Sequence, residues 1–89
     1  MSEKPRVFTV EIEVHEHPDH TEAKALLEID GDVRGGWGRA RRNPDDPERP
    51  LLGDELAMTR ALTDLARHLG SEVEEQIEAS EARPAHVHL

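Results

Sequence analysis

Three histidines and an aspartate lie close together near the amino terminus: His15, His17, Asp19 and His20. Imidazole is the commonest protein ligand for transition metals, and Zn²⁺ in particular accepts it. His15 and His17 are two residues apart, so on a strand both would project from one face, as a pair of metal ligands requires. His15, His17 and His20 are therefore the candidate metal ligands. The alternative is a group of solvated turn histidines, because the spacing fixes no fourth ligand.

A second group consists of Trp37 and the basic residues around it, with no acidic residue between positions 33 and 44. The basic residues are Arg34, Arg39, Arg41 and Arg42. An arginine beside an aromatic ring can grip phosphate or stack on a base. Trp37, Arg39 and Arg41 are therefore a candidate surface for a ligand, a protein partner or nucleic acid. The alternative is ordinary cross-strand ion pairing with three acidic residues. Those residues are Glu11, Glu13 and Glu28.

The remaining polar residues do not form a recognisable active site. Asp45, Asp46 and Glu48 could bind a hard cation, but they lie among prolines, where water stays close and carboxylate pKa values shift little. No serine, threonine or histidine stands in a nucleophile setting, and Gly36-x-Gly38 lacks the third glycine of a phosphate-binding loop. We therefore expect a non-catalytic protein without a cofactor.

The charge and composition restrict the partners. Twenty acidic residues against eleven basic ones give a formal net charge of −9, which disfavours nucleic acid and anionic membranes. There are no cysteines, so disulfides and thiolate chemistry are excluded. With one Phe, one Trp and no Tyr, the core must be built from Leu, Ile, Val and Ala. Such a core is thin, and a homodimer that buries a second apolar surface would stabilise it.

The elements that must position these groups follow from apolar periodicity. Residues 7–14 and 23–29 alternate apolar and polar side chains, which predicts two half-buried strands. The stretch from His15 to Thr21 reads as a turn or short loop. Asp30-Gly31-Asp32 predicts a tight reversal, because glycine can take the positive φ that hairpin turns need. A third strand is predicted from about Val33 to Arg41.

A long amphipathic helix is predicted after a proline-rich connection that spans residues 42–52. Gly53-Asp54-Glu55 is expected to open the helix, with Asp54 as the N-cap. The apolar stripe recurs at three- and four-residue spacing and passes Gly70 without a break, which favours one continuous helix. Its members are Leu62, Leu65, Leu69, Val73 and Ile77.

Three strands followed by one helix predict a two-layer α+β fold, in which the helix covers one face of an antiparallel meander. The direction of Trp37 is left open by the pattern. If Gly36, Gly38 and Ala40 face the helix, Trp37 shares the open face with its arginines. If Trp37 faces the helix, it is the largest residue of the core.

Three motifs resemble a family of small, uncharacterised bacterial proteins classed as a domain of unknown function. They are Thr21-x-Ala23-x-Ala25-x-Leu27, Gly36-x-Gly38-x-Ala40-Arg41-x-Asn43-Pro44-x-Asp46, and Gly53-Asp54-Glu55-Leu56-Ala57-x-x-Arg60-Ala61-Leu62-x-Asp64-Leu65. The resemblance implies a β-β-β-α fold like that of the double-stranded-RNA-binding domain, and it implies no activity. That domain has a helix before its sheet and lysines at the start of its last helix. Here six residues precede the first strand, and Asp54 and Glu55 would repel phosphate.

We therefore expect one domain over residues 1–89, with an ordered core at about 7–80. No apolar stretch reaches signal-peptide or membrane-spanning length, so a cytoplasmic protein is expected. The leading hypothesis is a binding module that acts through contacts with a protein partner and can form a homodimer. The alternatives are nucleic-acid binding through Trp37 and its arginines, and a histidine metal site.

Overall fold

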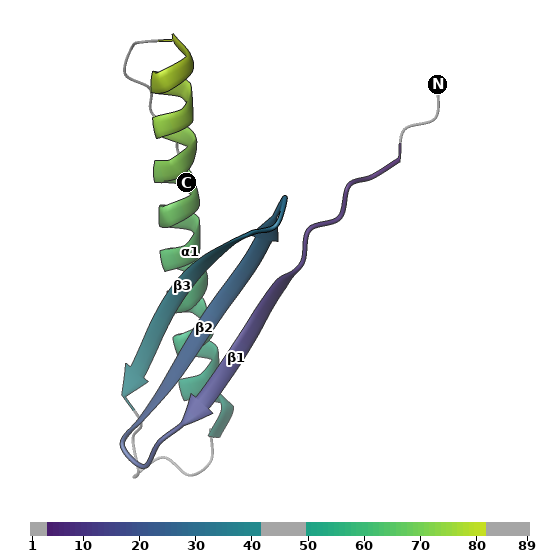
Figure 1. Cartoon of the computed structure of the whole chain (residues 1–89). Coiled ribbons are helices and arrows are strands. Elements are labelled where there is room, and N and C mark those ends of the chain that lie inside the picture. The colour runs from purple at the N-terminus through teal and green to yellow at the C-terminus, as the bar shows by residue number, and fades with distance from the viewer. Residues whose placement is uncertain (1–3, 42–49, 82–89) are drawn as a thin grey trace.

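The computed structural model describes residues 4–41 and 50–81. It contains three strands and a helix: β1 (Val10–Glu16), β2 (His20–Ile29), β3 (Asp32–Arg41) and α1 (Pro50–Glu81) (Figure 1). The strands form one antiparallel sheet in the order β1-β2-β3, and α1 packs on one of its faces. The predicted two-layer α+β fold with the order β-β-β-α is confirmed.

The two hairpins differ in how well the sequence predicted them. Asp30 and Gly31 both have positive φ, 51° and 85°, as a two-residue turn between twisted strands requires. The first hairpin is tighter than expected, because β1 continues to Glu16 and β2 begins at His20. The predicted loop, from His15 to Thr21, is therefore too long. Apolar alternation ends at Val14, whereas backbone pairing continues regardless of side-chain polarity.

The helix and β3 approach each other closely because small residues line both surfaces. A Cβ atom on Gly36 would lie 2.2 Å from the carbonyl oxygen of Ala61, and one on Gly38 would lie 2.2 Å from that of Ala57. Ala57 and Ala61 are fully buried against these glycines. Contact between the two backbones therefore fixes the position of α1 on β3.

The start of α1 differs from the prediction. The helix begins at Pro50, so Gly53-Asp54-Glu55 lies inside it, and its first turn has no acidic residue. Proline is well suited to the first helical position, because its φ is already helical and its missing N–H would have no partner there. The prediction that α1 continues through Gly70 is confirmed. Residues 42–49 of the expected extended connection, with Arg42, Asp45, Asp46 and Glu48, lie outside the described residues.

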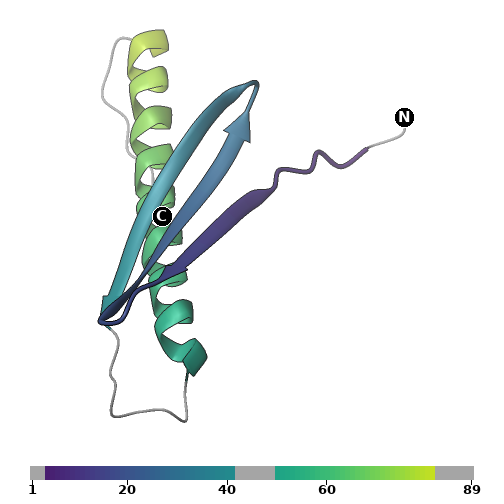
Figure 2. The same ribbon diagram turned by 60° about the horizontal axis from the view of Figure 1, so that its bottom comes forward.

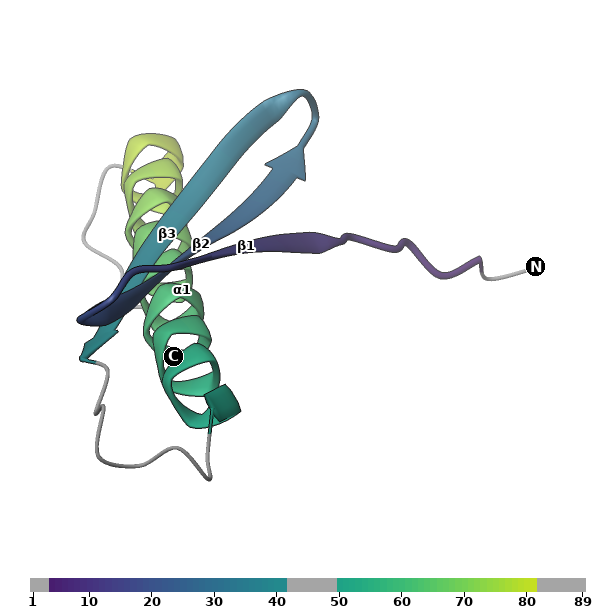
Figure 3. The ribbon, with the colours of Figure 1, turned by 90° about the horizontal axis from the view of Figure 1, so that it is seen from below.

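The core is as thin as the composition predicts. It consists of small and medium-sized side chains, and among the described residues no large side chain is fully buried. The buried apolar residues are Ala23, Ala25, Leu27, Ala40, Ala57, Ala61 and Leu65. Figures 2 and 3 show that α1 lies along β3 and β2. The amino-terminal end of β1 diverges from the helix. Within residues 4–41 and 50–81, no helix is long and apolar enough to cross a membrane.

Candidate functional site

The register of the sheet decides which side chains share a face. Ala23 and Ala25 of β2 are buried under α1, and their β3 partners are Gly38 and Gly36. Residues between these positions point to the opposite, open face. Trp37 is therefore on the open face and is 48% exposed, so it is not a core residue.

Arg39 and Arg41 lie on the same open face as Trp37. They pair in register with Glu22 and His20 of β2. Two of the expected ionic partners of the arginines, Glu11 and Glu13, are on β1, which β2 separates from β3. The predicted cross-strand pairing with these two glutamates is therefore wrong, because in the meander β1 and β3 are not neighbours.

Arg34 lies on the other face, where it binds the helix. Its Nε and Nη2 atoms donate to the two carboxylate oxygens of Glu72 at 2.8 and 2.6 Å. The hydrogen bond from Arg34 lowers the pKa of Glu72 below its usual value of 4.5. Arg34 therefore attaches α1 to the hairpin end of β3 and takes no part in a surface with Trp37.

An open hollow of about 300 Å³ lies beside the end of β3. It is lined by Asp19, His20, Arg39, Arg41 and Arg60. The structure thus brings two of the candidate arginines to one candidate metal ligand, a juxtaposition that the sequence did not predict. The carboxylate of Asp19 offsets part of the positive charge there, and its pKa is lowered chiefly by a hydrogen bond from His20.

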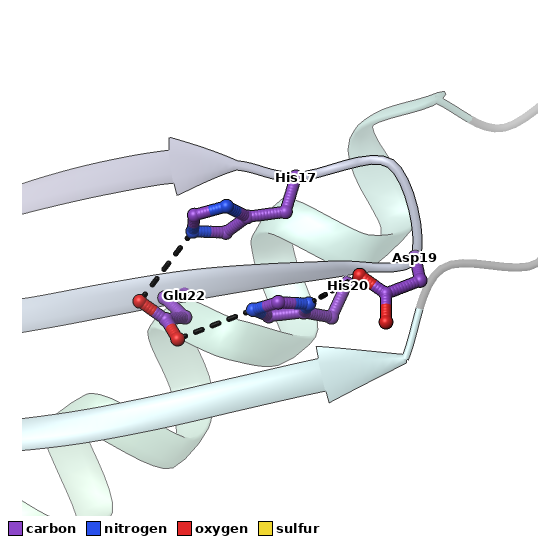
Figure 4. A network of polar contacts seen from close by, with 4 residues as sticks. All are labelled: His17, Asp19, His20 and Glu22. Carbon is purple, nitrogen blue, oxygen red and sulfur yellow. Dashed lines mark hydrogen bonds and ion pairs between the residues drawn. The ribbon is translucent and has the colours of Figure 1, made fainter.

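The histidine cluster forms at the β1–β2 hairpin (Figure 4). The backbone N–H of His17 donates to the carbonyl of His20 at 2.8 Å, which closes the turn. The imidazole rings of His17 and His20 stack with their centroids 4.3 Å apart and 15° between their planes. His15 is on β1 in register with Glu22. Of the three predicted ligands, the structure thus brings the rings of His17 and His20 together.

Glu22 completes the cluster and was missed by the sequence analysis. Its Oε1 lies 3.2 Å from Nε2 of His20, and its Oε2 lies 3.6 Å from Nε2 of His17. The other ring nitrogen of His20, Nδ1, lies 2.7 Å from Oδ1 of Asp19. The pKa of Glu22 is lowered chiefly by its hydrogen bond with His20. The available signal was the two-residue spacing of His20 and Glu22, which places both on one face of a strand.

The outer edge of β3 is covered by side chains of α1. Arg60 donates to the carbonyl of Arg39 at 2.6 Å, and Asp64 accepts from the N–H of Trp37 at 2.9 Å. A ring nitrogen of His68 lies 2.8 Å from the carbonyl of Gly35. Three side chains spaced four residues apart on α1 thus bind the backbone groups of β3 that point away from β2.

The outer edge of β1 differs. The N–H of Trp37 points away from β2, and the direction of the backbone groups alternates along each strand of an antiparallel sheet. Followed through the registers of the two strand pairs, this alternation places the N–H and C=O groups of Val10, Ile12 and Val14 on the outer side of β1. Val10 and Val14 remain 38% and 36% exposed on the helix side of the sheet. Before β1, the chain leads away from the sheet and the helix (Figure 1), and Phe8 in this segment is 58% exposed.

Comparison with known proteins supports a family assignment. A family model described as Rv2632c-like matches residues 6–86. The chain is similar to the uncharacterised protein Rv2632c of Mycobacterium tuberculosis, with 41% identity over 84% of this chain and 81% of that one. It is equally similar to the uncharacterised protein Mb1767 of Mycobacterium bovis, with 41% identity over 88% and 83%.

A solved structure extends the similarity to three dimensions. The crystal structure of Rv2632c superposes with a TM-score of 0.83 at 37% identity, covering 94% of this chain and 100% of that one. The match includes the three strands and the long helix, so the fold is shared as well as the sequence. The chain belongs to the Rv2632c-like family.

Proposed function

We propose that this protein is a non-catalytic protein-binding module whose first partner is a second copy of itself, joined through the edge of β1. The observation that carries the proposal is the contrast between the two sheet edges. Side chains of α1 bind the edge of β3, whereas among the described residues no element pairs with the edge of β1. An unpaired edge is a template for an added strand.

The thin core also supports a self-associating protein. Among the described residues no large side chain is fully buried. A partner that buries a second apolar surface would therefore add stability that the single chain lacks.

The apolar surface beside β1 has the right position for this role. Val10 and Val14 face the side of the sheet on which α1 lies, and Leu62 of α1 is 41% exposed. Ile12 and Met58 are partly buried and pack against the core between these positions. An added strand would extend the sheet and cover this surface, which burial from water would favour.

The charges on β1 favour one register for a pair of antiparallel β1 strands. Centring the pair on Val10 places Phe8 opposite Ile12 of the second copy and Glu11 opposite Thr9. Centring it on Ile12 would place Glu11 opposite Glu13 twice, and like charges directly opposite one another are destabilising. The register centred on Val10 also pairs residues 4–9, which are outside any strand in the single chain.

A single-cysteine variant tests this arrangement, since the chain has no cysteine of its own. Val10→Cys places two sulfurs across the symmetry axis, where a Cα separation of about 5.5 Å is suited to a disulfide. Val33→Cys is the matched control, because Val33 is an exposed valine on β3. We expect mild oxidation to link Val10→Cys into dimers and leave Val33→Cys largely monomeric.

Two results would contradict the proposal. One is equal cross-linking of the two variants, which would indicate random collision. The other is sedimentation of the unmodified chain as a monomer at ~100 μM, where even a weak dimer would be populated.

Nucleic-acid binding through Trp37, Arg39 and Arg41 is the second candidate, supported by their position together on the open face. Glu22 lies in register with Arg39, and the net charge of −9 opposes phosphate. The likeness to a double-stranded-RNA-binding domain stays a prediction. Fluorescence anisotropy with labelled duplex RNA at several salt concentrations tests it, with Arg39→Ala/Arg41→Ala as the comparison. Unchanged affinity in that double variant would exclude this surface.

A further inference from the structure

We infer that the β1–β2 hairpin carries a binding site for a divalent transition metal of the zinc class, with His17, His20 and Glu22 as protein ligands. The inference does not rest on the proposed dimer, because all three ligands come from one hairpin of a single chain (Figure 4). Three potential ligand atoms, one from each side chain, all lie within 4.8 Å of one another.

The distances are close to those of a metal site. Zinc bonds of about 2.0–2.1 Å in a tetrahedron place ligand atoms roughly 3.3 Å apart. Nε2 of His20 is 3.2 Å from Oε1 of Glu22, and Nε2 of His17 is 3.6 Å from Oε2. Glu22 thus directs one oxygen toward each ring. Small rotations of these side chains would bring them to one ion.

Asp19 gives His20 the outer partner typical of a metal-bound histidine. Oδ1 of Asp19 lies 2.7 Å from Nδ1 of His20, on the side of the ring away from Glu22. A carboxylate that accepts a hydrogen bond from Nδ1–H fixes the ring orientation and leaves the Nε2 lone pair available to bind a metal. With the proton on Nδ1, two acceptors face each other, Nε2 of His20 and Oε1 of Glu22. A cation between them removes that repulsion.

The surroundings indicate which ion fits and how tightly it binds. Two imidazoles and one carboxylate favour zinc-class ions over Mg²⁺ and Ca²⁺, which prefer oxygen ligands alone. The side chains of His17 and Glu22 are 43% and 34% exposed, so water has access to a fourth position. Arg39 and Arg41 are in register with Glu22 and His20, and their positive charge reduces the affinity. A site of moderate affinity follows.

Calorimetric titration with ZnCl₂ at neutral pH tests the site in the full chain. The starting protein carries His86→Ala and His88→Ala, which removes the two other closely spaced histidines of the sequence. We expect one zinc ion per chain, no heat with MgCl₂, and a loss of affinity of about 100-fold in His17→Ala, His20→Ala or Glu22→Gln. Asp19→Asn is expected to weaken binding by about 10-fold, as loss of an outer partner does.

His15→Ala is the matched control, since His15 belongs to the same sequence cluster but is not among the three grouped ligands. It should keep the affinity of the starting protein. Far-UV circular dichroism of each variant separates loss of a ligand from loss of the fold. Absence of zinc binding in a folded starting protein would overturn the inference. So would equal affinity in all the ligand variants, or a loss in His15→Ala as large as that in His17→Ala.

Discussion

The two edge strands of the sheet differ in how their outward backbone groups are covered. Along β3, Arg60, Asp64 and His68 bind backbone groups that point away from the sheet. Along β1, the corresponding outward groups belong to Val10, Ile12 and Val14, beside apolar side chains that remain partly exposed. The same chain thus protects one edge and presents the other, which is the pattern expected of a protein that adds a strand at one place only.

The protection of β3 depends on a match between two repeats. Four residues of a helix rise about 6.0 Å, and two residues of a strand rise about 6.8 Å. Side chains at every fourth position of α1 therefore meet every second residue of β3 over a short distance. Gly36 and Gly38 make the match possible, because they let the helix backbone lie against the strand.

The largest effect is expected from Gly38→Val, which would leave both edges uncovered. Its Cβ would lie 2.2 Å from the carbonyl of Ala57 and 2.4 Å from the N–H nitrogen of Ala61, and both atoms are backbone. The helix must move away, so we expect destabilisation by more than about 4 kcal/mol and loss of cooperative unfolding. Thermal unfolding followed by circular dichroism measures it.

Gly35→Ala is the matched control for that prediction. A Cβ at Gly35 has Leu26 Cδ2 as its nearest neighbour at 3.6 Å, an ordinary contact. The change in stability should stay within about 0.5 kcal/mol. If Gly38→Val unfolds at the same temperature as Gly35→Ala, close backbone packing does not hold the helix on β3.

An intermediate effect is expected from Asp64→Ala, which removes the acceptor for the N–H of Trp37. We expect a loss of about 1 kcal/mol, as for a typical hydrogen bond, and increased association through the uncovered β3 edge. Urea denaturation and light scattering measure the two parts. Asp64→Asn keeps an acceptor oxygen, so it should retain most of the stability and show little of the increased association. A result in which Ala and Asn behave alike would assign the effect to charge alone.

The smallest effect is expected from Glu72→Gln, at the hairpin end of β3. The carboxylate of Glu72 has a pKa lowered by Arg34, so it stabilises the fold above its usual value of 4.5. That contribution is lost as the pH falls through the lowered pKa. We therefore expect the variant to melt a few degrees below the unmodified protein at neutral pH, and the gap to close in acid.

Glu78→Gln serves as the control for Glu72→Gln, because Glu78 is exposed on the same helix. Melting curves from neutral pH down to about pH 3 cover the usual range of carboxylate titration. A gap that stays constant with pH would show that the Arg34–Glu72 pair does not act through the charge of Glu72.

Much of the fold could be predicted because local patterns agree with it. Alternation through Ile12 and Ala25, the Asp30-Gly31 turn and the unbroken stripe past Gly70 each have a local physical cause. The errors are at element ends. β2 begins at His20 and α1 at Pro50, because strand pairing and a proline at the first helical position carry no apolar periodicity.

The candidate sites were harder to predict, because each combines residues from separate elements. His17 and His20 were recognisable from their types, but Glu22 joins them only through its place on β2 and the closure of the hairpin. The contacts of α1 side chains with the outer edge of β3 were also missed. Asp64 lies 3.6 Å from Nε2 of His68 within the helix, a contact that four-residue spacing allows. Its second contact, with the N–H of Trp37, depends on where α1 packs on β3.

The number, type and order of the elements could be predicted from the sequence, because these depend on side-chain periodicity and turn chemistry. The direction of Trp37 depends on how α1 packs on the sheet, since both faces of β3 were compatible with the pattern. The backbone contact of Gly36 and Gly38 with α1 turns Trp37, Arg39 and Arg41 outward. The same contact leaves β1 as the edge that α1 does not cap, because one helix is too narrow to cover three strands.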